Sequence, residues 1–351
     1  MDNETPKIAM TSIYLEITRQ CNLQCKHCLR GDPQNMNMSN NQIDRILDNF
    51  NWIDQVFIGG GEPFLAKDSI SHLLSELKNK IEKGKFACRC VGLITNGTQR
   101  DKEVITLLNE MGKYLSDKWY KEDTKTISIG ISKDEFHDNN SENAMEWFKS
   151  ECDERYISLH FNELDIDKRT KKPIIEECER AIKNNLQYSK RYGISELHRV
   201  ELYKNTLFKF NKNDPNEEPK ILYDGDCLAF TCTDLFLKGG FYGYAEIDKP
   251  DYPFILGNYM EESVFDMIIN WNTLHPLLEQ QAIIYENLVK RGMTQKDKEK
   301  HIIRFHEKED EVRKQLSENK DNKDVWDIYK EVFHYDFAPE EIQEIKNFRK
   351  Q

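Results

Sequence analysis

Three cysteines near the start of the chain, Cys21, Cys25 and Cys28, form a Cys-x3-Cys-x2-Cys pattern. Three thiolates this close together can bind one side of an iron–sulfur cube. Electron-carrying clusters use four cysteines, so three leave one iron open to a substrate or cofactor. A structural zinc site is the alternative, with His27 as its fourth ligand. A histidine between two ligand positions would strain a tetrahedral site, and the spacing therefore favours the cluster.

Three further motifs follow segments that we expect to be strands, and each contains residues that can bind a polar ligand. They are Gly60-Gly61-Glu62-Pro63, Thr95-Asn96-Gly97 and Ser132-Lys133-Asp134. Glycines let the backbone approach a ligand closely because they lack a Cβ, although glycines after a strand can also form a plain turn. In α/β barrels, active sites gather at the carboxyl ends of the strands. We therefore expect these motifs and the cysteines to share one site.

Strand-like and helix-like segments alternate through residues 1–210, and they must position these motifs. The six expected strands are Ile13–Ile17, Gln55–Ile58, Cys90–Thr95, Thr126–Ser132, Tyr156–Phe161 and His198–Tyr203. Helical spacing of apolar residues predicts helices between them, including one that begins with a capping box of Ser39 and Gln42 and one over Ile174–Tyr192. Such alternation predicts parallel strands with crossover helices. The expected fold is α/β, a partial (β/α)6 TIM-like barrel.

The rest of the chain divides into two further regions. A polar stretch, Asn211–Pro219, is typical of a linker. Two short strands, Asp234–Leu237 and Phe241–Ala245, flank Gly239-Gly240 as in a hairpin, and a short helix is expected over Glu261–Trp271. Residues 211–285 are therefore predicted to form a small α+β extension. Residues 286–351 are rich in charge and predict a helical tail.

Composition limits the classes of function. The chain has 50 Lys and Arg residues against 62 Asp and Glu residues, and its net charge of −12 argues against non-specific nucleic-acid binding. No apolar run is long enough to span a bilayer, and residues 1–10 do not resemble a signal peptide. Nine cysteines in such a chain argue against a disulfide framework. We therefore expect a cytoplasmic protein that is not bound to a membrane.

The cysteine pattern and the three motifs, in this order, resemble the radical S-adenosylmethionine (SAM) superfamily over Ile13 to Leu207. The resemblance implies a [4Fe–4S] cluster on Cys21, Cys25 and Cys28, with the amino group and carboxylate of SAM bound to the open iron. It implies that an electron from an external donor of the flavodoxin or ferredoxin type cleaves SAM reductively. The 5′-deoxyadenosyl radical formed in this way would abstract hydrogen from a substrate.

The resemblance also implies a set of SAM contacts. They are His27, Gly60, Gly61, Glu62, Thr95, Ser132, Asp134 and Asn162. Glu62 would accept a hydrogen bond from the amino group of SAM. His27 matches a position beside the adenine, or it is a solvent-exposed loop residue. Asp134 would accept from a ribose hydroxyl or cap a turn. His137 and Asp138 could reach the substrate as candidate catalytic groups, or they belong to an exposed turn.

The other cysteines fall into two groups. Four of them are expected to pack in the core, namely Cys88, Cys90, Cys152 and Cys178. Cys227 and Cys232 precede the expected hairpin and resemble the start of a SPASM or twitch extension, which binds auxiliary clusters in peptide-modifying family members. No cysteine follows Cys232, and two thiolates are too few for such a cluster. Three interpretations stay open: a metal-free scaffold, which we favour, a smaller metal site, or a thiol that donates hydrogen to a substrate radical.

The extension favours a peptide or protein as the substrate. Modification of a small molecule is the alternative within the same family. From a different class, the chain could be a non-catalytic iron–sulfur or zinc protein on the same fold. Detection of 5′-deoxyadenosine would distinguish an enzyme from such a binding protein.

Overall fold

The computed structural model describes residues 8–28, 30–84, 86–120, 122–137, 141–164, 166, 171–173, 175, 179–186, 228–232, 236–238 and 255–267. Contacts divide the chain into two units. The site described below lies within the unit made of Met1–Arg191, Glu201–Asp248 and Gly257–Phe265. Among the helices in the described ranges, none is long and apolar enough to cross a membrane.

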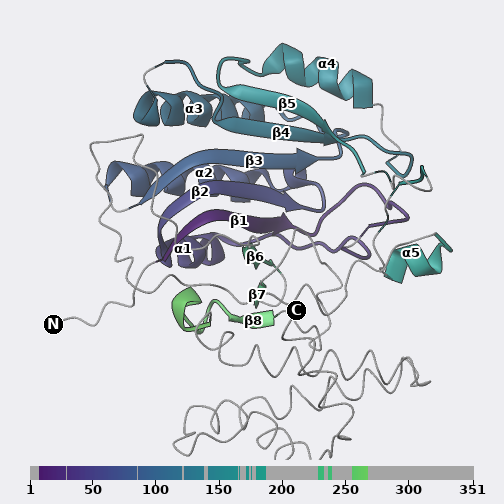
Figure 1. Ribbon diagram of the computed structural model, residues 1–351, viewed down its shortest axis with the longest axis horizontal. Coiled ribbons are helices and arrows are strands. Elements are labelled where there is room, and N and C mark those ends of the chain that lie inside the picture. Colours follow the sequence, from purple (N-terminus) through teal and green to yellow (C-terminus); the bar gives the residue numbers. More distant parts are fainter. Residues whose placement is uncertain are drawn as a thin grey trace, which may run out of the picture. The chain divides into compact units, whose positions relative to one another are not determined.

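A largely parallel sheet forms the centre of the fold (Figure 1), with its strands in the order β5-β4-β3-β2-β1-β6-β7-β8. The strands are β1 (Ile8–Thr18), β2 (Phe50–Gly60), β3 (Ala87–Thr95), β4 (Ile127–Ser132), β5 (Ile157–Asn162), β6 (Leu228–Phe230), β7 (Phe236–Lys238) and β8 (Ile255–Asn258). Every neighbouring pair from β5 to β6 is parallel, whereas β7 is antiparallel to β6. The α/β fold with six parallel strands confirms the expected partial TIM-like architecture, and the sheet is open over the residues described.

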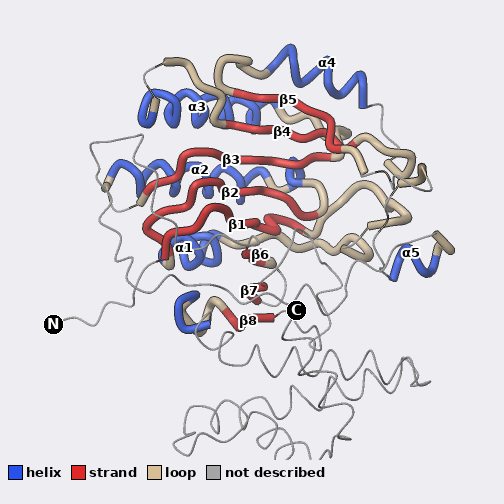
Figure 2. Tube along the Cα trace, in the orientation of Figure 1, coloured by secondary structure: helices blue, strands red, loops and turns tan. Residues whose placement is uncertain are grey.

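Helices connect the successive parallel strands from β1 to β5 (Figure 2). They are α1 (Asn40–Asp48), the short 3-10 helix η1 (Pro63–Leu65), α2 (Lys67–Glu82), α3 (Lys102–Trp119), α4 (Ser141–Glu151) and α5 (Glu179–Lys183). Ile13, Leu15 and Ile17 of β1 lie on one face of the sheet, because successive side chains of a strand alternate between its faces. All three are fully buried. Each such burial contributes about 1.5–3 kcal/mol, so this core holds the strands that carry the motifs.

The local signals in the first 162 residues were sufficient to locate five strands. The strands β1 to β5 confirm five of the six predicted ones, although β1 and β2 extend to 11 residues each. The capping box is also present. The hydroxyl of Ser39 accepts from the backbone N–H of Gln42, and the side-chain oxygen of Gln42 accepts from the backbone N–H of Ser39 at 2.8 Å.

The helix predicted over Ile174–Tyr192 is wrong in length, because α5 covers Glu179–Lys183 and the chain leaves the helix immediately afterwards. Asn185 has a left-handed φ of 53°, and the N–H of Leu186 donates to the carbonyl of Ala181 at 2.9 Å. This is the hydrogen bond of a Schellman ending, in which asparagine can replace glycine. The part of the prediction beyond residue 186 lies outside the described residues.

The sixth parallel strand observed is β6, which pairs with β1, whereas the predicted strand His198–Tyr203 lies outside the described residues. A strand of three residues is too short to show a period in the sequence. The strand β7 overlaps the predicted strand Asp234–Leu237, and its antiparallel partner is the preceding β6. The second predicted hairpin strand, the linker and the tail also lie outside the described residues, so the region boundaries at 210 and 285 stay predictions.

Candidate cofactor site

A cavity of about 290 Å³ lies at the carboxyl ends of the parallel strands. It brings together residues that the sequence analysis singled out from five separate segments. These are Cys21, Cys25, His27, Cys28, Gly60, Gly61, Thr95, Ser132, His137 and Asn162. Two other candidates in the described part of the chain, Glu62 and Asp134, do not line the cavity. The structure thus brings residues of the cysteine loop and of all three motifs to one cavity, and their roles as a site stay a prediction.

The cysteine loop, residues 21–28, leaves β1 and is held by the turn that follows β3. The side-chain amide of Asn96 donates to the side-chain oxygen of Asn22 at 3.0 Å and lies 3.8 Å from the sulfur of Cys21. The amide of Asn22 donates in turn to the hydroxyl of Thr98 at 2.7 Å. These contacts connect residues more than 70 positions apart in the sequence, and they position the loop over the cavity.

The three cysteines of this loop form no disulfide, are half-buried, and lie close enough to affect one another. Burial raises the pKa of Cys21, partly offset by a hydrogen bond from the N–H of Leu23, and the negative charges of Glu62, Cys28 and Cys25 raise it further. The thiolate is the form of cysteine that binds a metal, so metal binding releases a proton from each thiol that was protonated.

Gly60 and Gly61, at the end of β2, are required because the backbone at the end of β1 lies very close to them. A Cβ on Gly60, whose φ is 127°, would lie 2.1 Å from the carbonyl oxygen of Thr18, and one on Gly61 would lie 2.1 Å from that of Gln20. The N–H of Gly61 donates to the carbonyl of Thr18 at 2.7 Å. Only glycine fits at such close approach. The two glycines thus let the end of β1 run beside the end of β2, directly before the cysteine loop.

Glu62 is fully buried, and its carboxylate is bound by donors from the protein itself. It accepts from the backbone N–H of Phe64 at 3.1 Å and that of Asn96 at 2.8 Å, and the hydroxyl of Thr95 lies 2.8 and 2.9 Å from its two oxygens. Burial raises the pKa of Glu62 to about 7, although these hydrogen bonds lower it. The carboxylate joins the ends of β2 and β3 beneath the cavity, so its expected direct contact with SAM has no support in this geometry.

A model of the radical SAM superfamily matches residues 15–201, more than half of the 351 residues. The chain belongs to the radical SAM superfamily. The cofactors of this superfamily, a [4Fe–4S] cluster and SAM, are therefore the cofactors to which the cavity must be compared. The match begins within β1 and extends past α5, and it includes most of the residues that line the cavity.

This radical SAM chain is also similar to individual proteins, either over a short stretch or over a longer stretch at lower sequence identity. Over 109 residues it is 30% identical to a "tungsten-containing aldehyde ferredoxin oxidoreductase cofactor-modifying protein" of Pyrococcus furiosus, which covers 29% of this chain and 28% of that one. The structure "native anSMEcpe with bound AdoMet and Cp18Cys peptide" is 24% identical, covers 45% of this chain and 43% of that one, and has a TM-score of 0.31. Streptococcus suis SuiB bound to precursor peptide SuiA is 13% identical, with coverages of 74% and 64% and a TM-score of 0.43. The matches span less than two thirds of each of these proteins.

The donor set fits the radical SAM cofactors. Three thiols converge on one cavity, and the rest of the lining offers hydroxyl, amide and imidazole groups. Ser132 and Asn162 are paired across β4 and β5 in the register of the sheet, so both reach the cavity from adjacent strand ends. The hydroxyl of Thr95, which also lines the cavity, is hydrogen-bonded to the carboxylate of Glu62.

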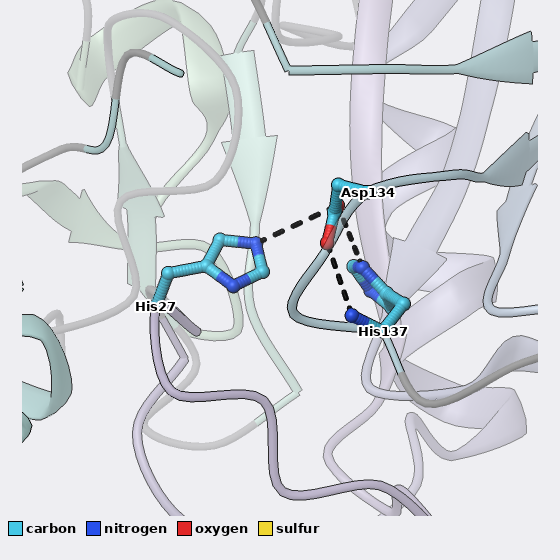
Figure 3. Close-up of side chains that lie close together, drawn as sticks. All are labelled: His27, Asp134 and His137. Atoms are coloured by element: carbon cyan, nitrogen blue, oxygen red, sulfur yellow. Dashed lines mark hydrogen bonds and ion pairs between the residues drawn. The ribbon is translucent and has the colours of Figure 1, made fainter. Parts of the chain in front are cut away.

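Two histidines and an aspartate, His27, Asp134 and His137, lie close together (Figure 3). The side chain of His27 is 13% exposed and its ring contacts that of Phe136, with centroids 4.7 Å apart, so the exposed-loop interpretation of His27 is wrong. Burial lowers the pKa of His27 to about 4. Asp134 caps its own turn by accepting from the N–H groups of Phe136 and His137 at 2.8 and 3.0 Å, which is the turn-capping alternative that the sequence left open. Asp138 lies outside the described residues.

A buried ionic network near the cysteine loop was not predicted. Glu16 of β1 accepts from the guanidinium groups of Arg19 and Arg30 at 3.1 and 2.9 Å, and Arg30 also bonds to the hydroxyl of Tyr14. Tyr14, Arg19 and Arg30 line the cavity, as does Arg180 of α5. A glutamate within the apolar run of β1 was the available signal, since a buried carboxylate requires a charged partner.

Of the three weak catalytic candidates, His137 lines this cavity, whereas Cys232 is buried and does not line it. Its side chain follows β6, it is 3% exposed, and its sulfur lies 3.9 Å from a carboxylate oxygen of Glu16. Burial raises the pKa of Cys232 to about 12, and the charge of Glu16 adds to the effect. These surroundings favour packing over hydrogen donation. Cys227 lies outside the described residues.

Proposed function

We propose that Cys21, Cys25 and Cys28 bind the [4Fe–4S] cluster and that the cavity beside them binds SAM. The observation that carries this proposal is the convergence of the three thiols with Gly60, Gly61 and the ends of β3, β4 and β5 on one cavity. A volume of about 290 Å³ is in the range of pockets that bind small molecules. Exactly three cysteine ligands leave one iron for SAM, as the superfamily requires.

The residues of the chain have separable tasks in this proposal. Ser132 and Asn162 offer polar groups to SAM from adjacent strand ends, and the ring of His27 offers an apolar face. Glu62 acts as a positioning residue, because its carboxylate accepts hydrogen bonds from the hydroxyl of Thr95 and the backbone N–H of Asn96. A further hydrogen bond from the N–H of Phe64 fixes the carboxylate itself. Asn96 in turn holds the cysteine loop. The buried network of Glu16 and Arg30 anchors the other end of that loop to β1.

When bound, the cluster and SAM supply an electron and a 5′-deoxyadenosyl radical that abstracts hydrogen from a C–H bond of the substrate. The protein binds and orients the reacting groups and excludes water from them. The electron comes from an external protein of the flavodoxin or ferredoxin type. This assignment makes the chain a radical SAM enzyme rather than a binding protein that kept the fold.

A peptide or protein is the proposed class of substrate. Its support is the resemblance of residues 211–285, with Cys227, Cys232 and Gly239-Gly240, to the extension of peptide-modifying family members. A small molecule or cofactor is the second candidate, and the name of the Pyrococcus furiosus protein is consistent with it over the 109 residues aligned. Limited proteolysis in the presence of candidate peptides would distinguish the two classes. A peptide substrate should bind the protein and protect it from cleavage. If the substrate is a small molecule, none of the peptides should protect it.

The test of the proposed function is anaerobic reconstitution followed by analysis of iron, sulfide and 5′-deoxyadenosine. We expect about four irons and four sulfides per chain, and formation of 5′-deoxyadenosine from SAM in the presence of dithionite. Stoichiometric zinc without labile sulfide would refute the cluster. A full cluster that never yields 5′-deoxyadenosine would favour the non-catalytic binding protein.

A further inference from the structure

Arginines outnumber carboxylates around the cavity. Among the described residues that line it are Arg19, Arg30 and Arg180, whereas Asp32 is the one lining carboxylate in that part of the chain. The arginines come from separate segments, since Arg19 follows β1, Arg30 follows the cysteine loop and Arg180 lies on α5. A charged group in a poorly hydrated place is costly unless it is paired, so the charges of the wall indicate what the cavity binds.

Arg180 reaches the cavity from α5 and contacts the segment after the cysteine loop. Its Nη1 donates to the carbonyl of Gly31 at 3.1 Å, and its Nε lies 3.8 Å from a carboxylate oxygen of Asp32. The side chain of Asp32 is 81% exposed, whereas that of Arg180 is 12% exposed. Water therefore screens this ion pair from the side of the carboxylate, and Asp32 offsets the charge of Arg180 only weakly.

Arg30 lies beside this contact, because it directly precedes Gly31 in the sequence. It donates through Nη1 to Glu16 at 2.9 Å and through Nη2 to the hydroxyl of Tyr14. Glu16 also accepts from Arg19 at 3.1 Å, so its single negative charge is divided between two guanidinium groups. Arg30 is thus fixed in place while Glu16 offsets only part of its positive charge.

The wall around Arg30 is preformed. The hydroxyl oxygen of Tyr14 lies over Gly59, where an added Cβ would be 2.1 Å from it, and both residues line the cavity. The side chain of Tyr14 is buried, and its ring centroid is 5.2 Å from the guanidinium carbon of Arg30. Groups that are held in this way lose little freedom when a ligand binds, and such a site binds more tightly than one made of mobile side chains.

The cofactors of the proposed function account for little of this positive charge. Three thiolates make the bound cluster anionic, and the sulfonium of SAM is a cation, so these two charges largely offset each other. The carboxylate of SAM would be bound to the open iron. A guanidinium group has five N–H donors in a planar fork, and this fork matches the two oxygens of a carboxylate. A carboxylate of the substrate is therefore the ligand that the arginines fit.

We propose that Arg180 and Arg30 form a subsite that binds a carboxylate of the substrate. The inference deepens the proposed function and rests on it, because it requires the cavity to hold SAM and the reacting part of the substrate together. It narrows the substrate to an acidic peptide or a small organic acid. Arg180 is then a residue that binds the substrate and determines specificity.

The test is anaerobic calorimetry of the reconstituted protein, first with SAM alone and then, at saturating SAM, with two pairs of small probes. N-acetylglutamate methylamide and N-acetylglutamine methylamide have the same shape and differ in the charge of the side chain. N-acetylalanine and its methylamide provide the same comparison for a terminal carboxylate. A wild-type protein that binds neither cluster nor SAM would refute the proposed function before any probe is added.

Three variants separate a binding role from a structural one. Arg180→Gln keeps an amide that can donate to Gly31 and removes the charge, whereas Arg180→Lys keeps the charge and removes the planar fork. Arg89→Gln is the matched control, because Arg89 is a half-buried arginine that pairs with Asp54 and does not line the cavity.

We expect the wild-type protein to bind one carboxylate probe at least about ten-fold more tightly than its amide, since hydrogen bonds to charged groups are the stronger ones. The pair that shows the preference identifies the carboxylate as that of a side chain or of a terminus. The preference should disappear in Arg180→Gln, fall in Arg180→Lys and stay complete in Arg89→Gln, while SAM affinity is unchanged in all three.

Equal affinity of the wild-type protein for the carboxylate and the amide in both pairs would overturn the inference, as would a full preference in Arg180→Gln. A loss of SAM affinity in Arg180→Gln would also overturn it, because the guanidinium would then bind the carboxylate of SAM. If Arg180→Gln does not fold, a full preference in Arg180→Lys would overturn the inference equally, because a lysine cannot form the paired hydrogen bonds.

Discussion

Cysteines occur in two kinds of surroundings in this fold, at opposite positions along the strands. Cys21, Cys25 and Cys28 are half-buried in a loop at the carboxyl end of β1 and line one cavity. Cys88 and Cys152 are buried outside that cavity, Cys88 at the start of β3 and Cys152 just after α4. Exposure to the cavity thus separates the thiols that can act as ligands from the thiols that pack.

The packing cysteines are held neutral by their surroundings. Burial raises the pKa of Cys88 far above the ordinary range and raises that of Cys152 to about 12. Cys88 is 0% exposed, and its carbonyl accepts from the indole N–H of Trp119 at 2.8 Å. A thiol that cannot ionise without leaving the core is a poor metal ligand, so the comparison predicts different responses to the same substitution.

The largest effect should come from replacing Cys21, Cys25 and Cys28 with Ala. Iron should fall from about four per chain to near zero after anaerobic reconstitution, because the cluster loses all of its protein ligands. Iron and sulfide analysis checks this. Cys88→Ala is the control, and it should keep the iron while destabilising the core. Iron of about four in the triple variant would instead reveal an auxiliary cluster elsewhere in the chain.

The same comparison should appear in thiol labelling of the metal-free protein. Alkylation of Cys88 and Cys232 should be at least about 100-fold slower than alkylation of the cysteine loop, because labelling a buried thiol requires local unfolding. Mass spectrometry of peptides from briefly labelled protein measures the rates. Reconstitution of the cluster should then protect the loop cysteines and leave Cys88 as before. Equal labelling of all five cysteines would show that the core is not packed as described.

The site was more predictable than the way in which it is held together. The cysteine spacing and the motifs after β2, β3 and β4 identified the lining of the cavity, because parallel strands bring their carboxyl ends to one edge. The connections between these segments were not visible. The pairing of Glu62 with Thr95 and Asn96 links residues more than 30 positions apart, and no local pattern reports which polar groups meet.

The fold shows the same limit at two particular elements. The apolar alternation of β1 to β5 was readable because each strand has enough residues for a period of two. The helix α5 ends at two adjacent asparagines, Asn184 and Asn185, the second of which has a positive φ. The pattern of residues that predicted the helix continues through them, and the helix was therefore predicted too long. The strand β6 has three residues and is defined by its pairing with β1 rather than by its own sequence.

The third prediction concerns Glu62, which joins the two glycines to the turn that holds the cysteine loop. Glu62→Ala should weaken SAM binding about ten- to a hundred-fold while iron stays near four, since hydrogen bonds to a charged group contribute roughly 1.5–3 kcal/mol. The loss would act through the turn of Thr95 and Asn96, whose donors lose their acceptor. Anaerobic calorimetry with SAM measures the affinity.

A matched control for this variant is Glu103→Ala, because Glu103 is an exposed carboxylate paired with Lys67 on the surface. We expect it to bind SAM as the wild type does. Glu62→Gln keeps the shape of the side chain and should lose less affinity than Glu62→Ala. If Glu62→Ala and Glu62→Gln both bind SAM with wild-type affinity, Glu62 does not position the SAM site.

The smallest effect is expected at Cys232, where packing and hydrogen donation make opposite predictions. Its thiol lies in the core beside Glu16, which itself balances Arg19 and Arg30. Cys232→Ala should therefore lower the free energy of unfolding by about 1–3 kcal/mol through the space it leaves. The yield of product per 5′-deoxyadenosine should stay unchanged. Denaturant titration and a coupled assay of both products provide the two measurements.

A hydrogen donor would give the reverse pattern, in which the variant still cleaves SAM but product formation fails and stability barely changes. Cys227→Ala should be measured in parallel. If only this variant forms less product per 5′-deoxyadenosine, Cys227 is the hydrogen donor and Cys232 is a packing residue.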